Sequence, residues 1–158
     1  MERRKRKMKY EEIRADVTQF PVICHCISVD CAMGAGVVVP IKKKFPMLKR
    51  NCELYAVSNK KTTLGSAFRY EQNQEVCYNM FTKTRVRQNY STMGDTYYGN
   101  LENALEHVRD QMMEHKETHL WMPKIGSGLD RGNWETIKKI ILRVFQDTDI
   151  TITVCLWD

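Results

Sequence analysis

The sequence predicts an α/β domain in which helices cover both faces of a mixed β-sheet. Three observations support this fold class. Stretches of strand character alternate along the chain with segments whose apolar residues recur at helical spacing. The chain has 158 residues, the length of one domain that buries about two-thirds of its unfolded surface. Two short glycine loops each follow a strand-like run and lead into a helix-like segment, an arrangement typical of the ligand-binding edge of such a sheet.

The strands are predicted from runs that are apolar, β-branched or alternating. The run over residues 20–27 is largely apolar, which is typical of a central strand buried on both faces. The polar segment 71–74 joins two such runs and indicates a hairpin. The predicted strands are residues 10–17, 20–27, 66–70, 75–82, 120–122 and 150–156.

The helices are predicted from the spacing of their apolar residues. Residues 37–45 begin with three valines, yet we expect a helix there, because Val37, Ile41 and Phe45 share one helical face. A second helix runs from residue 101 to about residue 116, and a third follows Asn133, which suits a helix N-cap. Residues 83–99 are predicted to form a loop.

The two glycine loops predict a site for a diphosphate. They consist of Met33, Gly34, Ala35 and Gly36, and of Ile125, Gly126, Ser127 and Gly128. Glycine lets the main chain approach an anion closely, and the helix that follows points unpaired amides and its positive dipole end at the same place. Neither loop matches GxGxxG or GxxxxGK[ST], so the common dinucleotide and P-loop motifs are absent.

Positive charge is concentrated at the N-terminus. The first nine residues carry +5 of the formal net charge of +6, so the rest of the chain is near neutral. We expect residues 1–9 to be a disordered basic arm and residues 10–158 to be the folded domain. The arm suits nuclear import or contact with a polyanion such as nucleic acid, and equally a solvated terminus.

The composition argues against membrane and disulfide-stabilised proteins. No apolar run approaches the roughly 18 residues that cross a bilayer, and the charged start does not resemble a signal peptide. Six cysteines fall mostly inside apolar runs, which is typical of reduced thiols packed as small hydrophobes. We therefore expect no membrane contact and a location in the nucleus, the cytoplasm or both.

A zinc site is not expected, although Cys24, His25, Cys26 and Cys31 lie close together in the sequence. Alternate residues of a strand face opposite ways, so His25 points away from both flanking thiols. The spacing also differs from that of known zinc motifs. We predict neither a metal nor a cofactor.

Two blocks of the sequence resemble the macrodomain family, and within it the terminal ADP-ribose glycohydrolase group. They are PVICHCISVDCAMGAGVVVPIKKKFP and HLWMPKIGSGLDRGNWETIKKII, and the likeness extends to residues 76–83 and 147–154. The resemblance implies a three-layer α/β/α fold with a mixed central sheet. It also implies that ADP-ribose binds in a cleft between the two glycine loops.

The resemblance assigns substrate-binding roles residue by residue. Asp16 matches the acid that meets the adenine amino group, although it also suits a turn. Trp157 matches an apolar residue against the adenine, although core packing explains it equally well. The complete set expected to contact the substrate is Asp16, Val17, Ser28, Met33, Gly34, Ala35, Gly36, Ile125, Gly126, Ser127, Gly128, Leu129 and Trp157.

Lys83 and Asp130 are the catalytic candidates that the resemblance supplies. Lys83 matches a lysine that forms a covalent adduct with the opened sugar, and Asp130 matches the acid that assists the leaving group and resolves the adduct. An amine must lose its proton to attack, and we expect the neighbouring Arg85 and Arg87 to assist by like-charge repulsion. Without the resemblance, Lys83 reads as a solvated strand end and Asp130 as a turn former.

The predicted function is hydrolysis of mono- or terminal ADP-ribose from acidic side chains of ADP-ribosylated proteins, through a lysine adduct. Three alternatives remain open at this point. One is a non-catalytic reader of ADP-ribose, and another is a hydrolase of ADP-ribose 1″-phosphate or O-acetyl-ADP-ribose. The third is a role on nucleic acid, motivated by the basic arm.

Overall fold

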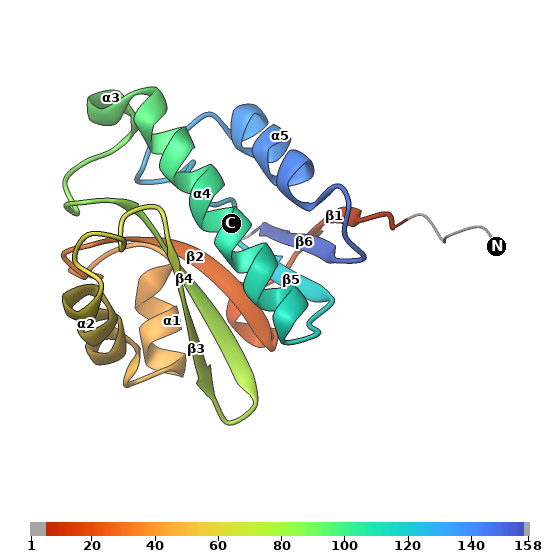
Figure 1. Cartoon of the computed structure of the whole chain (residues 1–158), viewed down its shortest axis with the longest axis horizontal. Helices are drawn as coiled ribbons and strands as arrows, with labels where there is room; N and C mark the ends of the chain where they lie inside the picture. The colour runs from red at the N-terminus through yellow and green to blue at the C-terminus, as the bar shows by residue number, and fades with distance from the viewer. Residues whose placement is uncertain (1–5, 157–158) are drawn as a thin grey trace.

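The computed structural model describes residues 6–156, which form a three-layer α/β/α domain around a mixed sheet (Figure 1). The six strands of this part of the chain lie in the order β1-β6-β5-β2-β4-β3. Neighbours pair in parallel except β3, which is antiparallel to β4. The strands are β1 (Lys9–Arg14), β2 (Val22–Ser28), β3 (Ala67–Gln72), β4 (Glu75–Lys83), β5 (His119–Met122) and β6 (Thr151–Leu156). The predicted fold class is confirmed.

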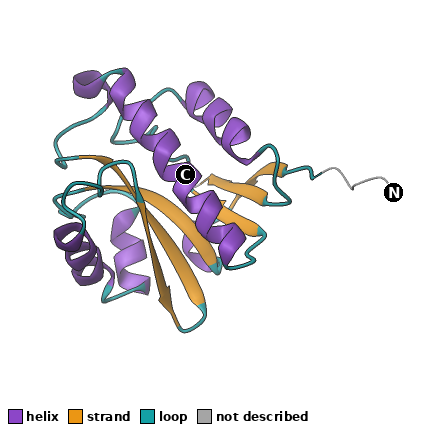
Figure 2. Ribbon diagram, in the orientation of Figure 1, coloured by secondary structure: helices purple, strands orange, loops and turns teal. Residues whose placement is uncertain are grey.

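Helices lie on both faces of the sheet (Figure 2). On one face, α4 (Asp95–Glu114) and α5 (Trp134–Phe145) bury an apolar cluster that includes Leu105 and Ile141. On the other face, α1 (Val38–Lys44) and α2 (Leu48–Ser58) bury a second cluster that includes Ile41 and Leu48. Among the described residues, no helix combines the length and the apolar character needed to cross a bilayer.

The central strand β2 separates the two clusters by alternation. Ile23 and Ile27 belong to the cluster under α1 and α2, whereas Cys24 belongs to the cluster under α4 and α5. This is the period of two that a strand imposes on its side chains. All six cysteines are free thiols, as the sequence predicts.

Most predicted elements are present, and the structure differs from the prediction in four places. The first strand, predicted over residues 10–17, ends at Arg14, and the short 3-10 helix Val17–Gln19 follows it. The basic arm, predicted to run to residue 9, ends before Lys9, because β1 begins there and the Lys9 backbone N–H donates to the Ile150 carbonyl. Residues 1–5 of the arm lie outside the described part of the chain. Helix α2 was not predicted. The segment 83–99 is not a continuous loop, since it holds α3 (Tyr90–Met93) and the first turn of α4. An Asn89–Thr92 capping box starts α3, and Gly94 with φ +62° allows the sharp turn into α4.

His25 is buried in the middle of β2 and bonded to one side chain. The Asn79 amide donates to the carbonyls of Phe68 and Cys77, so its oxygen accepts from His25 Nε2 at 2.6 Å. Nδ1 has no hydrogen-bond partner among the described residues. Burial lowers the pKa of His25 to about 4, so the ring is neutral in the folded protein.

We expect His25 to make stability depend on pH. Because the pKa is about 6.5 in the unfolded chain and about 4 in the folded protein, the unfolded chain binds the extra proton between these values. The free energy of unfolding should therefore fall by roughly 3 kcal/mol from pH 7 to pH 4 on account of this residue. Urea titrations across that range measure it. His25→Gln keeps an N–H for Asn79 without a titrating ring, and an equally steep decline in that variant would contradict the assignment.

Candidate functional site

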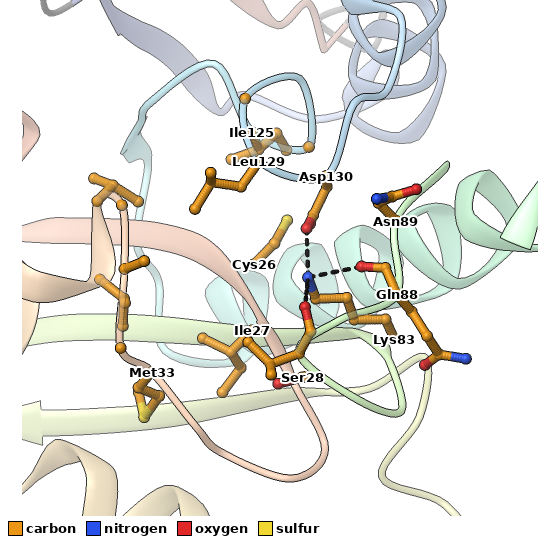
Figure 3. Close-up of a pocket in the computed structure, with 18 of the residues that line it drawn as sticks. Cys26, Ile27, Ser28, Met33, Lys83, Gln88, Asn89, Ile125, Leu129 and Asp130 are labelled. Atoms are coloured by element: carbon orange, nitrogen blue, oxygen red, sulfur yellow. Dashed lines mark hydrogen bonds and ion pairs between the residues drawn. The ribbon is translucent and has the colours of Figure 1, made fainter. Parts of the chain in front are cut away.

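A cleft opens at the sheet edge where the parallel strands β2, β4 and β5 end (Figure 3). Its volume is about 340 Å³, within the range of small-molecule sites. The structure brings most of the predicted site residues together here. Those that line the cleft are Ser28, Met33, Gly34, Ala35, Gly36, Lys83, Ile125, Gly126, Gly128, Leu129 and Asp130.

Lys83 is the last residue of β4, and its side chain is directed into this cleft. Nζ donates to Asp130 Oδ1 at 2.6 Å and to the carbonyl oxygens of Val86 and Gln88 at 2.9 and 3.0 Å (Figure 3). Three acceptors match the three N–H donors of an ammonium. The free protein thus holds Lys83 in a defined position, 7% exposed, with a carboxylate as its charged neighbour.

Arg85 and Arg87 were expected to help Lys83 lose its proton by like-charge repulsion. In the described part of the chain neither arginine contacts Lys83 directly. Both arginines are exposed, and the interactions of Lys83 are those with Asp130 and the two carbonyls. Proximity in sequence does not produce a contact between these side chains and Lys83, although Arg87 is among the residues that line the cleft. The carboxylate that lies close enough to accept a proton from the Lys83 ammonium is that of Asp130.

Asp130 is held through three of its atoms. Oδ1 accepts from Lys83, and Oδ2 accepts from the hydroxyl of Tyr97 at 2.5 Å. Its main-chain carbonyl accepts from the Tyr90 N–H at 2.7 Å, which ties the loop to the start of α3. The carboxylate is therefore fixed in position at the end of the cleft that contains Lys83.

The second glycine loop is shaped by close contacts that leave no space for side chains. Gly126 has φ +70°, and a Cβ there would lie 3.0 Å from the Tyr97 hydroxyl oxygen. Gly132 donates its N–H to the Gly126 carbonyl at 2.7 Å, and a Cβ on Gly132 would lie 2.6 Å from that oxygen. The hydroxyl of Ser127 donates to the Lys124 carbonyl at 2.9 Å, and Ser127 is not among the described residues that line the cleft.

The first glycine loop approaches the second across the cleft. The exposed side chain of Leu129 lies over Gly36, so that a Cβ on Gly36 would be 3.1 Å from Leu129 Cδ1. Ser28 lines the cleft, but its hydroxyl donates to Asp30. Asp30 also accepts from the Val86 N–H at 3.0 Å and thereby joins the first loop to the segment that holds Lys83.

Cys26 is a further nucleophilic side chain among those that line this cleft. Burial raises the pKa of its thiol, with the nearby Asp130 acting in the same direction. The thiol stays protonated near neutral pH and is a poor nucleophile. Lys83 is thus the stronger candidate for attack on a bound substrate.

A second cavity of about 720 Å³ continues the cleft at its other end. The two cavities share Gly36, Val37, Pro123 and Lys124 as lining residues. Asp16 and the buried Val17 line the second cavity. The Asp16 side chain also forms a turn, since Oδ1 accepts from the Thr18 N–H and hydroxyl, and these bonds lower the pKa of Asp16. Trp157 lies outside the described residues.

Comparison with known proteins identifies relatives with similar sequences and folds. No family model matches the chain. The ADP-ribose glycohydrolase OARD1 of Homo sapiens is 36% identical over 132 residues, which cover 84% of this chain and 79% of that protein, and the Bos taurus protein gives the same values. This likeness decides the family.

The chain belongs to the macrodomain family. Its relatives include the ADP-ribose glycohydrolase OARD1. The macrodomain of Thermus aquaticus DarG superimposes with a TM-score of 0.75 at 18% identity, covering 94% of this chain and 98% of that one. The Oceanobacillus iheyensis macrodomain with ADP has a TM-score of 0.75 and 15% sequence identity, and the match covers 93% of this chain and 82% of that one. Thermosipho africanus DarTG in complex with ADP-ribose has a TM-score of 0.71 and 16% sequence identity, and the match covers 86% of this chain and 38% of that one.

Sequence reasoning missed several residues of this macrodomain site, among them Cys26 and Gln88, which line the cleft, and Tyr97. The most informative of these is Tyr97. It lies in the segment that was predicted to be a loop, and its hydroxyl contacts Asp130. A signal was present, because Tyr97 precedes Leu101 and Leu105 at intervals of four residues and so extends their apolar face by one turn. Gly94 and Gly99 obscured it, since glycine is a poor helix former.

Proposed function

We propose that this macrodomain hydrolyses the bond between ADP-ribose and an acidic side chain, acting on a single or terminal unit. The observation that carries the proposal is the contact of Lys83 with Asp130 inside a cleft bounded by two glycine loops. A relative named as an ADP-ribose glycohydrolase and a structural neighbour in complex with ADP-ribose support this class of activity and ligand.

The continuous cleft suggests how the ligand lies. The diphosphate is placed between the glycine loops, where exposed main chain is available at Gly34 and Gly128. The adenine is placed in the second cavity beside Asp16 and Val17. The distal ribose then extends toward Lys83, which lies at the other end.

The proposed reaction begins with a proton transfer from Lys83 to Asp130, along the 2.6 Å hydrogen bond that joins them. The neutral amine forms a bond to the anomeric carbon of the distal ribose. The bond from that carbon to the acceptor oxygen breaks, and the acceptor carboxylate leaves with the electron pair. The ring carbon–oxygen bond of this sugar then breaks, and the ring oxygen takes a proton from the amine nitrogen, which leaves a protonated imine between Lys83 and the opened sugar. Water adds to the imine carbon, the carbon–nitrogen bond breaks, one proton of the water passes to the solvent, and the sugar ring closes again. The proton on Asp130 then returns to the amine.

A peptide carrying ADP-ribose on one glutamate tests the proposal. The wild-type protein should release free ADP-ribose and the unmodified peptide, and calorimetry should show saturable binding of ADP-ribose. Saturable binding without release would instead establish a reader. Turnover confined to ADP-ribose 1″-phosphate or O-acetyl-ADP-ribose would establish the other hydrolase activity.

Asp16→Asn should weaken ADP-ribose binding by roughly tenfold, the effect of losing a hydrogen bond to a charged group. The amide oxygen can still accept from Thr18, so the turn is preserved, while the new amide N–H₂ opposes the adenine amino group. The hypoxanthine analogue carries a carbonyl at that place and should bind the variant better than the wild type does. Calorimetry with both ligands measures this, and unchanged affinities would restrict Asp16 to a role in the turn.

A further inference from the structure

Tyr97 bonds to the oxygen of Asp130 that Lys83 does not use. The Tyr97 hydroxyl donates to Oδ2 at 2.5 Å, whereas Lys83 donates to Oδ1 at 2.6 Å. Tyr97 lies in the first turn of α4, and Lys83 ends β4, so different elements carry the two partners. Each carboxylate oxygen therefore has a separate donor.

The Tyr97 side chain is held rigidly. It is fully buried and belongs to the apolar cluster beneath α4 and α5, together with Leu101 and Ile137. A Cβ on Gly126 would lie 3.0 Å from the hydroxyl oxygen and 3.2 Å from Cε1, so the ring packs directly against the second glycine loop. Burial also raises the pKa of Tyr97, which keeps the hydroxyl protonated as a donor.

We propose that Tyr97 is a positioning residue, which holds the carboxylate of Asp130 in place when Lys83 moves from Asp130 to the sugar. The inference rests on the proposed function. In the free protein Lys83 bonds to one carboxylate oxygen, and attack on the anomeric carbon removes that bond. The bond from Tyr97 does not depend on Lys83, so the carboxylate keeps one fixed partner. Tyr97 itself transfers no proton, and Oδ1 alone exchanges one with the amine.

Tyr97→Phe removes the hydroxyl and keeps the buried ring. We expect kcat to fall roughly 10- to 100-fold, the effect of losing a hydrogen bond to a charged group, while KM and the Kd for ADP-ribose stay within about twofold. The acid limb of the pH–rate profile should move to higher pH, because the ionised carboxylate loses a donor. A purely structural role predicts neither the split between kcat and KM nor this movement.

Tyr98→Phe is the matched control. Tyr98 is the next residue of α4, and its hydroxyl accepts from the Asn133 N–H at 2.9 Å without contact to Asp130 among the described residues. The wild-type rate and pH profile are expected in this variant. An equal loss of kcat in both variants would show that any missing hydroxyl loosens α4, and would overturn the proposal.

A readout that needs no activity separates this inference from the proposed function. With ¹³C-labelled aspartate, the Asp130 carboxyl resonance, assigned through Asp130→Asn, should titrate at higher pH in Tyr97→Phe than in the wild type. If the wild-type protein releases no ADP-ribose, the proposed function fails, whereas this titration still decides whether Tyr97 stabilises the carboxylate. Identical titration in the two proteins would overturn the inference.

Discussion

Replacing Lys83 with alanine should abolish turnover and leave ADP-ribose affinity nearly unchanged. Without the amine no bond forms to the anomeric carbon, and the loss of a nucleophile lowers kcat by at least roughly 1,000-fold. The glycine loops and the cavity beside Asp16, which are proposed to bind the diphosphate and the adenine, keep their lining residues. Release of ADP-ribose from a glutamate-linked substrate and calorimetry with free ADP-ribose give the two values.

The Lys83→Arg variant distinguishes the role of the Lys83 amine as a nucleophile from the role of its positive charge. The guanidinium of the variant can still pair with Asp130, whose side chain is 12% exposed, so the carboxylate keeps a cationic partner. A guanidinium does not become a neutral nucleophile, however. We expect Lys83→Arg to be as inactive as Lys83→Ala and to unfold at a denaturant concentration closer to the wild type. More than a tenth of the wild-type rate in either variant would contradict the role given to Lys83.

Gly132→Ala should distort the second glycine loop and weaken ligand binding. The new Cβ would lie 2.6 Å from the Gly126 carbonyl oxygen and 2.9 Å from Ile137 Cδ1, distances at which the backbone must move. We expect the free energy of unfolding to fall by roughly 1–3 kcal/mol, as for other overpacked sites. ADP-ribose affinity should fall at least tenfold, because the displaced loop is proposed to supply amides for the diphosphate. Denaturant titration and calorimetry measure the two effects.

Gly99→Ala is the control for this substitution. Gly99 lies inside α4, and a Cβ there meets no heavy atom within 4 Å. Alanine should therefore stabilise the protein by about 0.5–1 kcal/mol through helix propensity, with unchanged ADP-ribose binding. Normal affinity in Gly132→Ala would show that the second glycine loop does not hold the diphosphate.

The sequence predicted the sheet and the meeting of the two loops because those features depend on local patterns. The apolar run of β2 is long, and the period of Val37, Ile41 and Phe45 distinguishes α1 from a strand. Parallel strands then place their carboxyl ends at one edge, which brings Lys83 close to Asp130.

Other features are only weakly marked in the local sequence and depend on tertiary contacts. Helix α2 buries only Leu48, Cys52 and Ala56, while Leu54 and Val57 are exposed, so its apolar face is poorly marked. The start of α4 contains Gly99, and burial of Tyr97 compensates for weak helix propensity there. Among the described residues neither Arg85 nor Arg87 contacts Lys83 directly, and this was likewise not deducible from their distance along the chain.

Reductive trapping tests the central claim most directly. Wild-type protein turning over an ADP-ribosylated glutamate peptide is treated with borohydride, which reduces an imine between the amine and the opened sugar to a stable bond. Mass spectrometry of the digest should place ADP-ribose on the peptide that contains Lys83, and Lys83→Arg should carry none. Continued release of ADP-ribose with no trapped adduct, or an adduct on a different lysine, would contradict the account.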